Sequence, residues 1–208
     1  MNDDRGLSSG NSPWLIGAMA AIALGLSWSA DAAGPLLVAE TFTATTANMT
    51  PAGVNLRIQV IAWQDAAARA EAVATLAAGA DAPTPLAKLP TVGYVWPNGS
   101  PVGYSVKYAN HSQESSGNER VTLVTEKRLG SYDFKGWSVA GAAAGNDAPY
   151  SVIELELNGA GAGTGTLSLA GEVLLDEGAG TVALKPGGPS LLTNVKRETG
   201  QTDKRPRP

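Results

Sequence analysis

Two glutamates with strand-like spacing, Glu154 and Glu156, are the residues best suited to acid–base chemistry. They alternate with the apolar Ile153, Leu155 and Leu157, and residues two apart in a β-strand project from the same face. Paired carboxylates of this kind serve glycoside hydrolysis or Ca²⁺ binding, and they equally form the solvated face of a half-buried strand. A carboxylate-based hydrolase acting on carbohydrate is therefore one candidate function, although the pattern assigns neither glutamate a catalytic role.

Groups for nucleophilic or metal catalysis are scarce. The chain has one histidine, His111, and no cysteine, which excludes disulfides and thiol catalysis and disfavours a transition-metal site. Ser138 lies in a stretch, GWSVA at 136–140, that is one residue short of a G-x-S-x-G motif. That motif needs a helix after the serine, and a Gly-Ala stretch follows instead. We therefore expect no metal, no cofactor and a role in binding more than in catalysis.

The glycine run at 159–165 has the composition of a phosphate-binding loop but not its chemistry. A P-loop ends in lysine followed by serine or threonine, and no lysine lies between Lys135 and Lys185. The next residues, TLSLAG at 166–171, alternate with period two, which is typical of a strand. The run is therefore predicted to be a turn between two strands.

Four aromatic residues form the candidate ligand-binding cluster. Tyr94 and Trp96 share one face of a predicted strand, and Tyr104 and Tyr108 share a face of the next. If residues 97–101 close a hairpin, the rings stand side by side across the two strands. Exposed, they would form a stacking platform for a sugar or a partner protein; buried, they would belong to the core. Both interpretations remain open at this point.

The elements that hold these residues are mostly strands. Alternation with period two predicts strands at 39–47, 54–63, 92–96, 102–109, 120–126, 150–157, 165–171, 181–185 and 191–196. The alanine-rich stretch 65–78, with Asp65 as N-cap and Gly79 as stop signal, predicts a helix, and a short helix at 84–89 completes a helical hairpin. Strands in close succession favour antiparallel pairing. We predict a single α+β domain at 39–198: an antiparallel sheet or sandwich of seven to nine strands with one helical hairpin.

The two ends of the chain have compositions of their own. Residues 1–33 are typical of a signal peptide, because Trp14–Trp28 is an uncharged apolar run and Ala30-Asp31-Ala32 offers a cleavage site. The run is shorter than the roughly 20 residues of a membrane span. A secreted or periplasmic protein is predicted, with membrane attachment only through an uncleaved leader. The polar residues 199–208 are predicted to form a disordered tail.

Several stretches together resemble a group of uncharacterised secreted bacterial proteins. They are Trp63-Gln64-Asp65-Ala66, the Leu-Pro-x-Val-Gly-Tyr segment at 89–94, the Tyr-x-x-Ile-Glu-Leu-x-Leu strand at 150–157 and the terminal strand Leu-Thr-Asn-Val-Lys-Arg-Glu at 192–198. The resemblance spans most of residues 39–198. It implies export and the order strand, helix, strand, and it implies no activity, cofactor or catalytic residue.

The expected function is binding by an exported domain. The formal net charge of −4 argues against nucleic acid as a partner, since that would need a basic patch. A small molecule, a glycan or a protein remain as partners. The alternatives are the carbohydrate hydrolase above and a structural component of a surface assembly joined through sheet edges.

Overall fold

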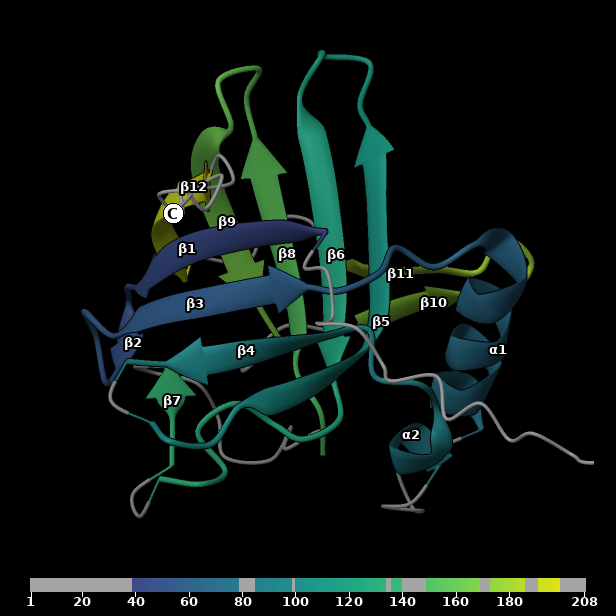
Figure 1. Cartoon of the computed structure of the whole chain (residues 1–208), viewed down its shortest axis with the longest axis horizontal. Helices are drawn as coiled ribbons and strands as arrows, with labels where there is room; N and C mark the ends of the chain where they lie inside the picture. Colours follow the sequence, from purple (N-terminus) through teal and green to yellow (C-terminus); the bar gives the residue numbers. More distant parts are fainter. Residues whose placement is uncertain are drawn as a thin grey trace, which may run out of the picture. The chain divides into compact units, whose positions relative to one another are not determined.

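The chain folds around a closed eight-stranded antiparallel barrel (Figure 1). The computed structural model describes residues 39–78, 85–98, 100–133, 136–139, 149–168, 173–185 and 191–198, all within the compact unit Pro35–Pro208. The predicted leader and tail lie outside these residues. Around the barrel the strands follow the order β1 (Glu40–Thr46), β12 (Leu192–Glu198), β9 (Ala162–Leu167), β8 (Val152–Leu157), β6 (Glu119–Thr125), β5 (Tyr104–Gln113), β4 (Gly93–Pro97) and β3 (Asn55–Val60), which pairs with β1 again.

Alternation along each strand fills the barrel with apolar side chains. In β1, Phe42 and Ala44 are buried while Thr41, Thr43 and Thr45 face outward. The same pattern in the other strands builds one core. Each Å² of apolar surface that the core removes from water contributes roughly 25 cal/mol to stability. Its members from the strands include Leu56, Ile58, Val95, Val106, Val121, Leu123, Ile153, Leu155, Leu157, Leu192 and Val195.

A second layer covers the outer face of β5, β6 and β8. It consists of α1 (Ala66–Ala77), the single turn α2 (Pro85–Lys88) and the hairpin of β10 (Val173–Asp176) and β11 (Thr181–Leu184), which lies beside α1 in Figure 1. Asp65 caps α1 by accepting a hydrogen bond from the amide of Ala68 at 2.9 Å, as the sequence predicts. The helices and the hairpin enclose a separate apolar cluster that contains Ala72, Val73, Leu76, Tyr108, Val124, Val152, Val182 and Leu184.

An irregularity in β5 divides that strand between the two clusters. The β5–β6 register shifts between Val106 and Tyr108, and a bulge of this kind reverses which side chains face inward. Tyr104 and Val106 therefore lie in the barrel, whereas Tyr108 packs under the helices. Lys107, at the bulge, donates from Nζ to the carbonyl of Leu89 at 2.9 Å and so ties the end of α2 to the barrel.

Part of the glycine run is strand and not turn. The connection between β8 and β9 is limited to residues 158–161, and β9 already contains Gly163 and Gly165. A Cβ on Gly163 would lie 1.7 Å from the carbonyl oxygen of Glu156 on the neighbouring strand. The glycines are therefore required where β9 approaches β8 closely, which periodicity alone does not reveal.

The fold class is confirmed in its broad form and corrected in its architecture. The protein is β-rich and antiparallel, with few helical residues. The predicted sheet or sandwich is a barrel, because β12 pairs with both β1 and β9 and so joins the two ends of the sheet. Three short strands were not predicted: β10, and the pair of β2 (Met49–Thr50) and β7 (Ser138–Val139) beside β4 in Figure 1.

Candidate functional site

Two adjacent hollows lie where β3 begins and β4 ends. The first, which we call the end groove, has a volume of about 650 Å³ and is lined by Thr50, Pro51, Val54, Pro97, Asn98, Ser100, Pro101, Val102, Tyr132, Asp133, Gly136 and Trp137. The second, the side hollow, has a volume of about 330 Å³ and is lined by Thr43, Asn55, Leu56, Arg57, Trp96, Pro97, Asn98 and Ser100. They share Pro97, Asn98 and Ser100, so a single extended ligand can contact both.

The end groove presents apolar surface to solvent. Val102 and Tyr132 are each 47% exposed, and both line the groove. Beneath them Trp137 is almost fully buried and donates from Nε1 to the carboxylate of Asp133. A concave surface with apolar walls and a few oriented polar groups is the usual form of a ligand site.

Tyr104 holds the turn that carries Tyr132. The Tyr104 hydroxyl accepts hydrogen bonds from the amides of Gly130 at 3.1 Å and Tyr132 at 3.2 Å. The rings of Tyr104 and Tyr132 are 4.6 Å apart between centroids. Burial raises the pKa of the Tyr104 phenol, although the two amide hydrogen bonds act in the opposite direction. The barrel interior thus positions one wall of the end groove.

The side hollow lies against a Trp96–Arg57 pair on the outer face of the barrel. Trp96 is opposite Arg57 in the β3–β4 register, and the guanidinium carbon lies 5.6 Å from the indole centroid, within the range of a cation–π contact. The indole packs close to the backbone at Gly103, where a Cβ would come within 2.7 Å of its ring atoms. Glycine at this position therefore lets the indole pack against the backbone just before β5.

The structure separates the four predicted aromatic residues. Tyr94 and Trp96 are half-buried neighbours on the outer face, 5.3 Å apart between centroids. Tyr104 is buried in the barrel and Tyr108 is buried under the helices, where its hydroxyl donates to the carbonyl of Gly180 at 3.2 Å. The expected four-ring platform does not form, because β5 turns Tyr104 and Tyr108 toward the two cores. Of the four, Trp96 lines the side hollow, and Tyr94, Tyr104 and Tyr108 line neither of the two hollows described above.

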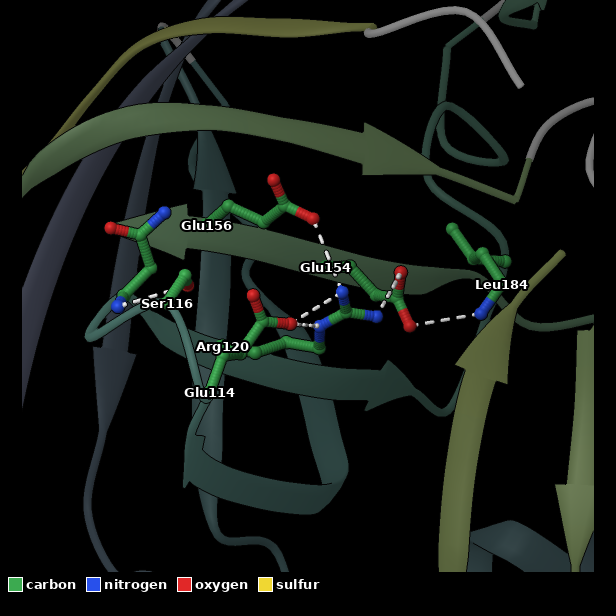
Figure 2. A network of polar contacts seen from close by, with 7 residues as sticks. Glu114, Ser116, Arg120, Glu154, Glu156 and Leu184 are labelled. Atoms are coloured by element: carbon green, nitrogen blue, oxygen red, sulfur yellow. Dashed lines mark hydrogen bonds and ion pairs between the residues drawn. The ribbon is translucent and has the colours of Figure 1, made fainter. Parts of the chain in front are cut away.

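The two predicted glutamates lie side by side on β8 but in different environments (Figure 2). Glu154 is buried, and its Oε1 accepts from the amide of Leu184 at 2.9 Å. Glu156 is exposed and pairs with Nη2 of Arg120 at 3.3 Å, while the same guanidinium pairs with Glu114 at 2.6 Å. Nη1 of Arg120 is 3.9 Å from Oε2 of Glu154. One arginine therefore joins three carboxylates from the outer strand faces and the β5–β6 connection.

The environment of Glu154 makes its charged form less favourable than that of a carboxyl group in water. Burial raises the pKa of this carboxyl, and the Leu184 amide and the Arg120 charge oppose the shift only in part. Neither Glu154 nor Glu156 lines the two hollows. Their observed role is to hold the β10–β11 hairpin and the β5–β6 connection against β8.

The other residues weighed for chemistry lie apart from each other. His111 stacks on Trp63 with centroids 4.6 Å apart, and its Nδ1 is 3.6 Å from a carboxylate oxygen of Glu119. That carboxylate also accepts from Arg197 at 2.6 Å. Ser138 lies in the short strand β7. In the described ranges no three His, Asp or Glu side chains gather in a way that could hold a metal ion.

Sequence reasoning missed most of the residues that line the hollows. Val54, Val102, Tyr132 and Arg57 carried no motif, and they come from three segments that are distant in the chain. The available signal was the concentration of proline and glycine at 97–103, which marks a turn that a ligand could approach. It could not indicate which other segments would face that turn.

The fold is a closed antiparallel β-barrel with two adjacent hollows where β3 begins and β4 ends. No protein-family model matches the chain, and no curated protein or solved structure is significantly similar to it. Function is therefore inferred from the geometry. Among the described residues, no helix has the length and apolar character needed to cross a membrane.

Proposed function

We propose that this chain is an exported, non-enzymatic binding module that takes a saccharide in the end groove. The observation that carries the proposal is the solvent-exposed apolar wall of the groove, formed by Val102 and Tyr132. Sugar rings have apolar C–H faces that pack on aromatic and aliphatic side chains. Export is proposed because of the leader-like residues 1–33.

The polar lining supports a saccharide more than a lipid-like ligand. Thr50, Asn98 and Ser100 interrupt the apolar wall with short hydroxyl and amide groups. Such groups both donate and accept hydrogen bonds, as sugar hydroxyls do. A few polar groups in an otherwise apolar cavity orient a ligand and provide specificity.

Binding is favoured over hydrolysis because of where the carboxylates are. Glycoside hydrolysis uses two carboxyl groups that flank the scissile bond. Asp133 is the one acidic residue among the described residues of the two hollows, and it is bonded to Trp137. A surface assembly through sheet edges has less support, because each of the eight barrel strands is paired on both sides.

The test is a thermal-shift and titration screen of the full chain with neutral and acidic oligosaccharides. A ligand present at about 100 times its Kd adds about 2.7 kcal/mol to the free energy of unfolding, which raises Tm by several degrees in a domain of this size. The variant Val102→Asp places a charge in the apolar wall. It should weaken binding of the best oligosaccharide by at least about tenfold.

The matched control is Leu174→Asp. Leu174 lies on β10, outside both hollows, and is 47% exposed, like Val102. This variant should bind the oligosaccharide as the parent chain does. If no oligosaccharide raises Tm, or if Val102→Asp and Leu174→Asp bind equally well, the end groove is not a saccharide site.

A further inference from the structure

Arg57 differs from the other arginines of the described residues in what its guanidinium contacts. Arg120 and Arg197 pair with two or three carboxylates each. Arg69 and Arg128 donate to backbone carbonyls. In the described part of the chain no carboxylate forms an ion pair with Arg57, which lies over the Trp96 ring.

The guanidinium of Arg57 is oriented by its neighbours. With the Gln59 amide turned to satisfy both groups, its oxygen accepts from Nε of Arg57 at 3.2 Å and also from Nη2. Trp96 supports the guanidinium by the cation–π contact. The contacts leave Nη1 without a protein acceptor among the described residues and direct the exposed side chain to the side hollow.

Other hydrogen-bonding groups surround the side hollow. Asn55, Asn98, Ser100 and Thr43 line it together with Arg57, which is the one charged residue among the described lining. The Thr43 hydroxyl donates to Glu198 at 3.0 Å, toward β12 and away from β3. The side chains that line the hollow therefore carry one positive charge, although the Glu198 carboxylate lies next to Thr43. An oriented arginine with short polar neighbours is suited to a planar carboxylate, which it can bind through two parallel hydrogen bonds.

We propose that the side hollow is an oxyanion subsite, in which Arg57 pairs with the carboxylate of an acidic saccharide whose neighbouring sugar rings occupy the end groove. The inference rests on the proposed function, because it assigns the sugar rings to that groove. The two hollows are adjacent, because both are lined by Pro97, Asn98 and Ser100. A uronic-acid oligosaccharide has both required parts, a carboxylate and apolar ring faces.

The experiment compares trigalacturonate with its neutral trimethyl ester by titration of the full chain at pH 7. The two probes share their sugar rings and differ in charge. The parent chain should bind the acid at least about tenfold more tightly than the ester. In Arg57→Gln this preference should fall to within about twofold, because the extra affinity for the acid depends on the Arg57 guanidinium.

Lys196→Gln is the matched control. Lys196 lies in the same row of the outer face, opposite Thr43, which is itself opposite Arg57, so it lies about 10 Å from Arg57 by strand spacing. It removes one positive charge without altering the hollow and should keep the preference for the acid. If Lys196→Gln and Arg57→Gln reduce the preference for the acid equally, the preference comes from the overall charge of the protein. That result would overturn the proposal.

The remaining outcomes separate this inference from the proposed function. If the parent chain binds the acid and the ester with equal affinity, and Val102→Asp weakens the binding of both, the saccharide groove stands and the oxyanion subsite is overturned. A preference for the acid that survives in Arg57→Gln also overturns it. If trigalacturonate and its ester both fail to bind while another oligosaccharide binds in the end groove, the acidic ligand is wrong. If no oligosaccharide binds, both proposals fall.

Discussion

Glu154 and Glu156 show how two residues that look equivalent in sequence become different in the fold. Both project outward from β8, but the β10–β11 hairpin covers Glu154 and leaves Glu156 in solvent. Burying a carboxyl disfavours its charged form, and this effect exceeds the favourable contacts with Leu184 and Arg120. The buried glutamate is thus a structural acceptor with a raised pKa.

Glu154→Gln should change the pH dependence of stability. Because the folded pKa of Glu154 is raised, the unfolded chain releases its proton first as pH rises. The stability contributed by Glu154 is therefore present below its unfolded pKa, about 4.3, and is lost as pH rises through the folded pKa. Glutamine can still accept from the Leu184 amide. The free energy of unfolding of Glu154→Gln minus that of the parent should rise between pH 4 and pH 7 in urea titrations.

Glu156→Gln is the control at the neighbouring exposed position. A surface ion pair contributes about 0 to 1 kcal/mol, so this variant should shift the urea midpoint only slightly. If the free-energy difference for Glu154→Gln stays constant or falls from pH 4 to pH 7, burial does not dominate the titration of Glu154.

At the scale of elements, the turn at residues 129–133 depends on a strand that is distant in sequence. Tyr104, in β5, accepts from the amides of Gly130 and Tyr132, and Leu129 in the turn is itself buried in the barrel core. The β5 bulge leaves Tyr104 inside the barrel while it sends Tyr108 outside. One strand thus supports both the end groove and the helical layer.

Tyr104→Phe should weaken both the fold and the end groove. The change leaves two backbone amides without their shared acceptor, and an unsatisfied buried donor costs about 1–3 kcal/mol. We expect a loss of that size in the free energy of unfolding by urea titration, with weaker oligosaccharide binding because Tyr132 is less firmly held.

Tyr132→Phe is the control: it removes the hydroxyl of the neighbouring ring but leaves the Tyr104 oxygen to accept from the two amides. Tyr132 is exposed, and its contacts with Tyr104 and Lys127 use the ring and not the hydroxyl, so stability should change by less than about 0.5 kcal/mol. Equal stability of the Tyr104→Phe and parent chains would show that water replaces the Tyr104 hydroxyl at the turn.

At the scale of the whole molecule, barrel closure depends on close contacts at β9. Gly163 and Gly165 let this strand lie against β8, and β12 pairs with the other edge of β9. Closure leaves each barrel strand with two partners, which protects the edges from pairing with other chains.

Gly163→Ala should therefore destabilise the entire barrel. The added methyl would fall 1.7 Å from a backbone oxygen of β8, so the strands must move apart, at a cost above about 2 kcal/mol. Urea unfolding measures the loss. Gly159→Ala, in the adjacent turn with no atom within 4 Å of the new methyl, should cost little. Similar midpoints for the two variants would mean that β9 tolerates a side chain.

Local chemistry let the sequence determine most elements of this protein. Period-two alternation predicts β1, β3, β6 and β8 because one face of each strand points into the apolar barrel core. The cap signal at Asp65 predicts the start of α1 because the carboxylate satisfies a free backbone amide at the helix end. The antiparallel class follows from the short connections between strands.

Tertiary structure alone determined that the sheet closes into a barrel, which of the aromatic residues are buried, and where the hollows form. Alternation says which face of a strand is buried, but it does not say which strand lies next to it, and a sandwich and a barrel share the same pattern. The bulge at Lys107 reverses the faces of β5 without a local sequence signal. The hollows form where Val54, Val102 and Tyr132 meet, because long-range strand pairing brings together segments that have no relation along the chain.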